Sequence, residues 1–292
     1  MVHVNQQPGT RAAKVRFVLL CILAANLAVV VAKLVIGLNT NSLAVISDAM
    51  HSSVDSMNNI LALVVISFAA RGPDEEHPYG HQKFETLGAL AVVGFLSITG
   101  FELVRGAISR LWGGAPPLSV TGTQIAILSG TLVVNVVVAT YESRKGKELD
   151  SELLLADATH TKSDVLVTIG VLIGVLLSSH GWTWADPLVA LAVAVVIIIL
   201  AWGILARSIP VLVDTHAIPA EELRSSAEAV DGVRSAYSIR SRGSRVRSFA
   251  ELTIAVDREI SVETAHKTAD EVEAELKNRF GLYQVTVHVE PC

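Results

Sequence analysis

The apolar stretch that decides the class of this protein is DPLVALAVAVVIIILAWGILAR, residues 186–207. Between Asp186 and Arg207 the stretch contains no charged side chain. A run of about 20 apolar residues is long enough to cross the hydrocarbon core of a bilayer as an α-helix. We therefore predict that this stretch is a transmembrane helix and that the chain is an integral membrane protein.

Similar apolar runs occur five more times earlier in the chain. They predict helices over residues 16–37, 43–70, 84–111, 120–141 and 152–178. These runs account for a chain of 292 residues that is 51% hydrophobic and only 17% charged, whereas soluble domains carry about 25% charged residues. We expect residues 1–211 to form a membrane all-α bundle of six transmembrane helices.

The basic residues between the predicted helices set the expected orientation. Lys and Arg occur before the first helix, between the second and third, between the fourth and fifth, and after the sixth, whereas loops 38–42, 112–119 and 179–185 contain neither. Cytoplasmic loops carry the excess of Lys and Arg, so we expect both termini in the cytoplasm and the protein in the cell (inner) membrane. Lys33 and Arg110, near the outer helix ends, are expected to reach the interface by snorkelling.

After about residue 211 the composition becomes that of a soluble domain. Periodicity predicts, in order, a helix near 219–230, strands near 233–241 and 249–256, a helix over 261–280 and a strand over 284–289. This αββαβ order is typical of a small ferredoxin-like α+β domain, which we assign to residues 212–292 and expect to be cytoplasmic. About 80 residues enclose only a small core, so we expect this domain to oligomerise.

Composition also excludes some partners and sites. The net charge of −5 gives no reason to expect nucleic acid as a partner. The two cysteines, Cys21 in an apolar run and Cys292 at the last position, form neither a disulfide framework nor a thiolate metal cluster.

One pattern, D-A-x-H-x-x-x-D, occurs twice inside the predicted helices. The copies are DAMHSSVD, residues 48–55, and DATHTKSD, residues 157–164. Residues four apart share a helix face, so each copy offers one imidazole and one carboxylate on one side. Such groups at membrane depth mark ion or proton paths, although they also join helices by hydrogen bonds. Side by side, the two helices would supply a four-ligand set suited to a divalent transition metal, above all zinc: His51, Asp55, His160 and Asp164.

Each copy holds further charged residues beside these four. Asp48 and Asp157 each precede a histidine by three, so they could ligate the metal or, as we favour, orient the imidazole. Lys162 lies two residues after His160 and points roughly 200° around the helix, away from the site. We expect its ammonium group to pair with a carboxylate or to reach cytoplasmic water.

A second cluster of metal-ligand residues lies in the predicted loop between the second and third helices. The loop contains Asp74, His77 and His81, and Pro78 and Gly80 bend the backbone between the histidines. A turn of this kind could gather the three side chains around one ion. A solvated acidic loop without metal is the alternative.

A third cluster lies in the predicted soluble domain. His288 and Glu290 share one face of the last strand because side chains alternate along a strand. Glu251 on the preceding strand could join them, and His266 lies on the second helix of the domain.

With these motifs the chain resembles the cation diffusion facilitators, transporters that export divalent metals from the cytosol. The resemblance covers the six helices, the doubled H-x-x-x-D, the loop H-P-Y-G-H-x-K-x-E at residues 77–85, and the αββαβ domain. It implies a homodimer that exchanges a divalent metal for protons, with residues 212–292 serving metal sensing and dimerisation. It also implies a transport site of His51, Asp55, His160 and Asp164, a loop site of Asp74, His77 and His81, and a tail site that includes His266, His288 and Glu290.

The tail departs from the zinc-exporting members at two positions. In those members the first two strands of the tail each carry a histidine ligand, and here the positions are Tyr237 and Thr253. We therefore expect one weaker metal site in the tail rather than a two-metal site.

We interpret the chain as a Zn²⁺/H⁺ antiporter and not an enzyme. Ligation needs neutral histidine and ionised carboxylates, so metal and protons compete for one site, which alternating access turns towards each side of the membrane. Export of Fe²⁺, Mn²⁺ or Cd²⁺ is the alternative, because geometry and metal supply also decide selectivity. An intramembrane zinc hydrolase would need a motif such as H-E-x-x-H, which the sequence lacks. A membrane metal sensor that does not transport would not need a buried site.

Overall fold

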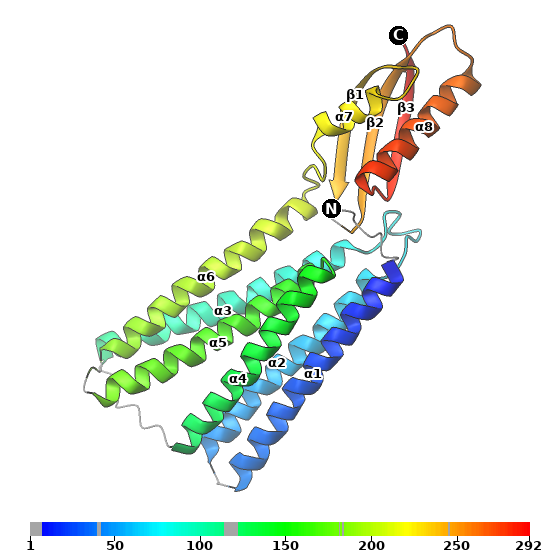
Figure 1. The fold of residues 1–292 in the computed structure, drawn as a ribbon. Coiled ribbons are helices and arrows are strands. Elements are labelled where there is room, and N and C mark those ends of the chain that lie inside the picture. The colour runs from blue at the N-terminus through cyan, green and yellow to red at the C-terminus, as the bar shows by residue number, and fades with distance from the viewer. Residues whose placement is uncertain (1–7, 40–41, 114–121, 181, 183, 245) are drawn as a thin grey trace. The chain divides into compact units, whose positions relative to one another are not determined.

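The computed structural model describes residues 8–39, 42–113, 122–180, 182, 184–244 and 246–292. Six of the helices in these residues are long and apolar enough to cross a membrane, and a small α+β domain follows them (Figure 1). The helices are α1 (Pro8–Asn39), α2 (Leu43–Ala69), α3 (Lys83–Gly113), α4 (Gly122–Glu148), α5 (Glu152–Ser179) and α6 (Ala185–Leu212). The domain contains α7 (Ala220–Glu228), β1 (Val233–Gly243), β2 (Ser248–Val256), α8 (Val262–Phe280) and β3 (Gln284–Pro291). The predicted fold class is confirmed.

Three of the six long helices extend well beyond the apolar runs that predict them. α1 begins at Pro8 instead of near residue 16, α4 continues to Glu148 instead of ending near residue 141, and α6 continues to Leu212 instead of ending near residue 207. An apolar run marks the part of a helix that lies in hydrocarbon. Polar residues continue α1 and α4 outside it, and α6 continues through Pro210, so hydropathy underestimates the helix length.

The helix bundle is apolar on its outside and closely packed inside. Large apolar side chains such as Phe101 and Trp202 are 67% and 68% exposed, as expected where lipid rather than water surrounds a helix. Glycine permits a close approach at one point, because a Cβ at Gly88 of α3 would lie 2.6 Å from Val65 Cγ1 of α2 and 3.0 Å from Leu153 Cδ1 of α5. Small residues at helix contacts in membranes have this effect.

The α+β domain contains a three-stranded sheet in the order β1-β2-β3. β1 and β2 are antiparallel, and β2 and β3 are parallel. Apolar residues from α7, β2 and α8 form its core, including Leu223, Ile254 and Leu276. Ser261 caps the start of α8 by accepting a hydrogen bond from the Thr264 N–H, and Gly281, at φ 67°, ends it.

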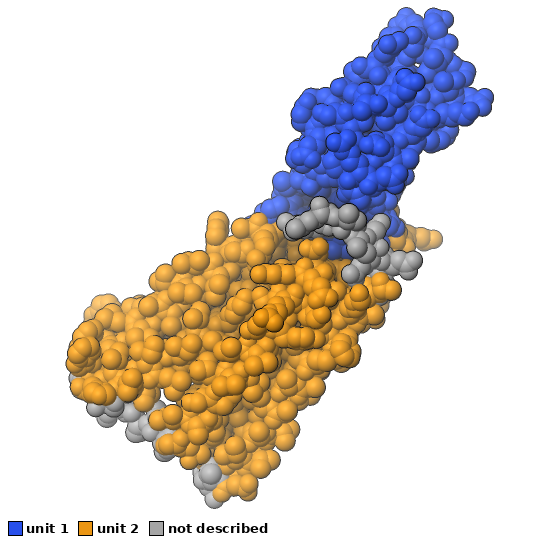
Figure 2. Space-filling model, in the orientation of Figure 1, with its two compact units in different colours: residues 1–8, 209–292 blue, residues 9–208 orange. Residues whose placement is uncertain are grey.

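The chain separates into two compact units (Figure 2). One comprises Gly9–Ser208 and the other includes Ile209–Cys292. The doubled motif and the loop cluster lie in the first unit, and the third cluster lies in the second.

Candidate metal centre

The two copies of the doubled motif lie on α2 and α5, and their ligand residues meet. His160 Nε2 lies 3.8 Å from Asp55 Oδ1 and 3.9 Å from Asp164 Oδ2. The ligand atoms of Asp55, His160 and Asp164 all lie within 4.8 Å of one another. The i, i+4 spacing of His160 and Asp164 places both on one face of α5, and Asp55 faces them from α2.

The His160 ring lies near both carboxylates, at distances too long for a hydrogen bond. Neither ring nitrogen of His160 has a hydrogen-bond partner among the described residues, although its side chain is only 12% exposed. A zinc ion bound tetrahedrally at about 2.0–2.2 Å from each ligand separates two ligand atoms by about 3.3–3.6 Å. The separations of 3.8 and 3.9 Å are slightly longer than this, so small side-chain movements would bring the donors onto one ion. The donor types and their proximity therefore fit a divalent metal ion.

The fourth predicted ligand, His51, falls outside the side chains that the structure describes. Its backbone belongs to α2, one helical turn before Asp55, so the two residues share a helix face. His51 remains the predicted fourth ligand on the strength of its spacing.

Asp48 and Asp157 contact residues other than the predicted metal ligands. Asp48 Oδ2 lies 2.9 Å from Lys33 Nζ of α1, so the buried Lys33 pairs with a half-buried carboxylate where the sequence predicts snorkelling. Asp157 Oδ2 accepts a hydrogen bond of 3.1 Å from Asn59 Nδ2 of α2. Asn59 Oδ1 in turn accepts from Asn26 Nδ2 of α1 at 2.7 Å. Asp157 therefore joins the two motif helices one turn away from the ligand cluster.

Glu142 is a buried acid that the sequence analysis does not single out. It lies on α4, is fully buried, and accepts a hydrogen bond of 3.1 Å from Thr161 Oγ1 of α5. Its Oε1 has no hydrogen-bond partner among the described residues. Hydropathy places Glu142 beyond the predicted end of the fourth helix, and the available signal is its helical spacing from the apolar residues Val138 and Ala139, which are also buried.

Lys162 points away from the cluster, as its position on the helix predicts. Its Nζ donates to Ser143 Oγ of α4 at 3.1 Å, and this contact is exposed. The partner is a hydroxyl group where the sequence predicts a carboxylate or water.

The loop between α2 and α3 gathers Asp74, His77 and His81, whose ligand atoms also lie within 4.8 Å of one another. Asp74 Oδ1 accepts the His77 backbone N–H at 2.7 Å, and Asp74 Oδ2 lies 3.3 Å from His81 Nε2. Gly80, at φ 84°, makes the turn between the histidines. The hydrogen bond from the His77 backbone lowers the pKa of Asp74, so its carboxylate is ionised at neutral pH.

The third cluster, in the α+β domain, does not gather three ligand groups as the other two clusters do. His288 Nε2 lies 3.5 Å from Glu290 Oε1 on the exposed face of β3. Glu290 Oε2 accepts a hydrogen bond of 2.5 Å from the Tyr237 hydroxyl, which raises the pKa of Tyr237. His266 lies on α8 and pairs with Asp270 at 3.8 Å, and Glu251 is adjacent to Arg240 across the ladder. In the described residues, clusters of three or more ligand groups occur only at the transmembrane and loop sites.

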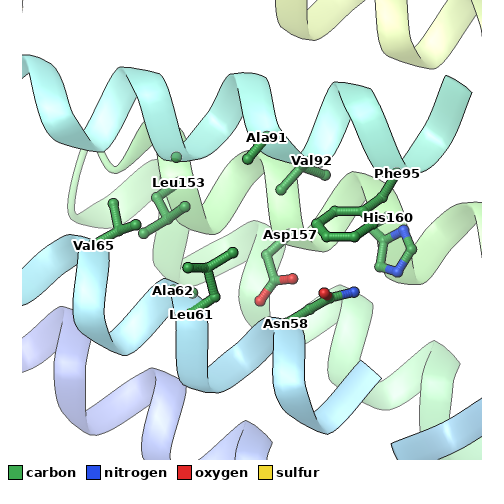
Figure 3. A pocket seen from close by; sticks show the side chains of 11 residues that line it. Asn58, Leu61, Ala62, Val65, Ala91, Val92, Phe95, Leu153, Asp157 and His160 are labelled. Atoms are coloured by element: carbon green, nitrogen blue, oxygen red, sulfur yellow. The ribbon is translucent and has the colours of Figure 1, made fainter. Parts of the chain in front are cut away.

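A cavity extends along the transmembrane cluster between α2, α3 and α5 (Figure 3). Its walls are mostly apolar, and its polar lining groups are Asn58, Asp157 and His160. In Figure 3 the Asp157 carboxyl and the His160 ring both face the space between the helices.

Comparisons with known proteins agree on one family. A sequence model of the "Cation efflux transmembrane domain" matches residues 19–213, and one of the "Cation efflux protein, cytoplasmic domain" matches residues 217–292. An uncharacterized transporter of Methanocaldococcus jannaschii is 30% identical over 273 residues, which are 92% of this chain and 95% of that protein. The cation-efflux pump FieF of Serratia proteamaculans is 30% identical over 89% of this chain and 87% of its own length. The manganese efflux system protein MneS of Bacillus subtilis is 27% identical over 92% and 93%.

Proposed function

We propose a function from the premise that this chain belongs to the cation efflux family and is therefore a transporter rather than an enzyme. The proposed function is the export of Zn²⁺ from the cytosol in exchange for protons. The observation that carries the proposal is the convergence of Asp55, His160 and Asp164 from two apolar helices. Charged groups inside a membrane are costly and are kept where an ion needs them.

The donor set supports zinc as the substrate. With His51 from the sequence, the site offers two imidazoles and two carboxylates, and zinc accepts such nitrogen and oxygen ligands in tetrahedral geometry. Imidazole favours zinc over harder ions such as Mn²⁺.

A manganese or iron exporter is the second candidate, and cadmium is a further possible substrate. Two of the three described donors, Asp55 and Asp164, are carboxylates, which suit Mn²⁺. The similar protein MneS is named for manganese efflux. The relative uptake of the metals decides between the candidates.

Protons and metal compete for the same atoms of this site. The His160 nitrogen binds metal only in its neutral form, and Asp55 and Asp164 bind it only when ionised. When the site faces the outside, protons arriving at these atoms displace the metal. When the site then faces the cytosol, the protons leave and a new metal ion binds, so alternating access couples the two fluxes.

The charges of the loops support one arrangement in the membrane. We propose that both termini and the α2–α3 loop lie in the cytoplasm of a cell whose inner membrane holds the protein, because Lys and Arg concentrate there. We also propose a homodimer that associates through residues 212–292, of which 217–292 match the family's cytoplasmic domain. The domain has a core of one sheet and two helices, and a core of that size gains from association.

Metal uptake into proteoliposomes tests the proposal. Purified protein is reconstituted with a metal-sensitive dye in the lumen, and Zn²⁺, Mn²⁺, Fe²⁺ and Cd²⁺ are added outside in separate runs. We expect zinc to enter fastest and uptake to increase when the lumen is acidic. Faster uptake of Mn²⁺ or Fe²⁺ would favour the second candidate, and a protein that binds metal without any uptake would be a sensor.

The control variant is E148Q. Glu148 forms an exposed ion pair with Lys145 at 2.6 Å on the surface of α4, and exposed pairs contribute little to stability. We expect E148Q to transport as the wild type does.

A further inference from the structure

Arg11 forms a buried set of hydrogen bonds that joins three parts of the bundle. It lies in the first turns of α1 and is only 8% exposed. Its Nη1 and Nη2 donate to the two carboxylate oxygens of Glu85 in α3, at 3.0 Å each. Its Nε donates to the Leu149 carbonyl at 2.7 Å, and Nη2 also donates to the Asp150 carbonyl at 2.9 Å. Bidentate Arg–carboxylate pairs are among the strongest hydrogen-bonded contacts.

The turn between α4 and α5 is shaped to accept these bonds. Asp150 adopts the left-handed backbone conformation, at φ 47°, and the Ser151 N–H donates to the Gly146 carbonyl at 2.9 Å. The tight turn presents its carbonyls to Arg11. A non-glycine residue with positive φ is strained and persists where its surroundings hold it.

The first turn of α3 makes two further contacts with the start of α5. Ser151 Oγ, fully buried, donates to Glu85 Oε1 at 2.5 Å, and Thr86 Oγ1 donates to Glu152 Oε2 at 2.8 Å. Together the five residues hold α1, α3 and the α4–α5 turn at one end of the bundle. We refer to this set as the Arg11 clamp: Arg11, Glu85, Thr86, Ser151 and Glu152.

One end of the cavity beside the transmembrane site lies within one helical turn of clamp residues along α3 and α5. Near the clamp it is lined by Gly88, three residues after Glu85, and by Leu153, two residues after Ser151. Further along the same helices it is lined by Phe95 and His160 (Figure 3). The ten residues from Glu85 to Phe95 correspond to about 15 Å of helix. The cavity therefore runs from the clamp to the metal ligands.

Ion pairs at the opposite end of the bundle join different helices. Lys33 of α1 pairs with Asp48 of α2, and Arg110 of α3 pairs with Asp186 of α6. Both pairs hold two helices together. The Arg11 clamp instead joins α3 to α1 and to the turn that begins α5, and α3 and α5 both line the cavity.

We propose that the Arg11 clamp closes the cytoplasmic end of the path to Asp55, His160 and Asp164 and opens in each transport cycle. The proposal rests on the proposed function for the direction of transport. Opening exposes Arg11 and Glu85 to water, and the hydration of the separated charges offsets much of the lost ion pair, because burial of the pair carries a large desolvation cost. The ion pair of Arg11 and Glu85 can therefore hold the helices together in one state and separate in another.

Thiol labelling from the cytoplasmic side tests the clamp. The two free cysteines, Cys21 and Cys292, are replaced by Ala, and V92C is introduced in the cavity lining. A membrane-impermeant maleimide is added to inside-out vesicles, and the labelling rate is compared in full-length protein with and without E85Q. We expect E85Q to raise the rate by roughly tenfold, because it removes the charge-assisted bidentate contact.

Two more variants keep the test decisive if E85Q folds poorly. S151A removes only the hydroxyl donor, and R11Q combined with E85Q removes both charges. Gel filtration in detergent checks the fold of each. R110Q, which breaks the ion pair at the opposite end, is the matched control and should leave the cytoplasmic labelling rate unchanged. Unchanged labelling in the folded clamp variants, or an equal rise in R110Q, would overturn the proposal.

The same vesicles separate the clamp from the proposed function. Labelling of V92C requires no transport. If the wild type moves no metal and E85Q still raises the labelling rate, the transport function is refuted and the clamp proposal is supported. Normal zinc uptake combined with unchanged labelling in the clamp variants would refute the clamp alone. Labelling that rises only from the outer face would overturn the cytoplasmic placement of the clamp.

Discussion

The transmembrane and loop clusters use the same residue types and differ in how far those residues satisfy one another. In the loop, Asp74 accepts a backbone N–H at 2.7 Å and lies 3.3 Å from a nitrogen of each histidine. In the membrane, His160 Nε2 remains 3.8 and 3.9 Å from the two carboxylates. An ion gains more where it displaces fewer contacts among its ligands. We therefore propose that the transmembrane cluster is the decisive site for transport.

The largest expected effect follows from removing a carboxylate of the transmembrane cluster. We predict that D55A and D164A each reduce zinc uptake to the level of empty vesicles, because water in the bilayer interior replaces a missing ligand poorly. The measurement is proteoliposome uptake at matched protein content. Gel filtration should show an intact dimer, and uptake at the wild-type rate in either variant would remove that residue from the transport site.

Selectivity at the same cluster should change with its nitrogen content. H51D makes the predicted site richer in oxygen, and oxygen ligands suit harder ions. We predict a higher ratio of Mn²⁺ to Zn²⁺ uptake in H51D, measured as competition in the same vesicles. An unchanged ratio would show that His51 does not set selectivity.

The loop cluster should have a smaller effect than the transmembrane cluster. We predict that D74A slows zinc uptake but leaves it well above that of D55A, because Asp74 is half exposed and lies outside the membrane-spanning path. Initial rates over a range of zinc concentrations measure the effect. A D74A variant as inactive as D55A would reverse the ranking of the two sites.

We expect the fold of residues 212–292 to depend least on metal, because the Tyr237 hydroxyl already donates a hydrogen bond to Glu290. We predict that this fragment folds without metal and dimerises, and that calorimetry detects at most one weak zinc site per chain. Two tight zinc ions, or unfolding on chelation, would contradict the prediction.

The raised pKa of Tyr237 means that its contact with Glu290 persists below the ordinary tyrosine pKa and is lost as the pH rises through the raised value. E290Q should therefore move the tyrosinate absorbance of Tyr237 to lower pH.

How well these sites can be predicted from the sequence depends on how far apart the interacting residues are along the chain. The i, i+4 spacing of His160 and Asp164 is local, so helical periodicity is enough to place them together. The contact between Arg11 and Glu85 spans 74 positions, and the helix that carries Arg11 starts before its apolar run. The sequence therefore assigns Arg11 to a charged flank, whereas the fold buries it. Lys33 is similar, because only the packing of α1 on α2 brings Asp48 close enough to pair with it.

Simultaneous recording of metal and proton flux tests the central claim most directly, because the claim is that both ions use the atoms of Asp55, His160 and Asp164. Proteoliposomes with an acidic lumen would carry one dye for zinc and one for pH. We predict that the lumen loses protons as zinc enters, that dissipating the gradient slows zinc uptake, and that D55A abolishes both signals together. Zinc uptake with a flat pH signal and no dependence on the gradient would contradict antiport at this site.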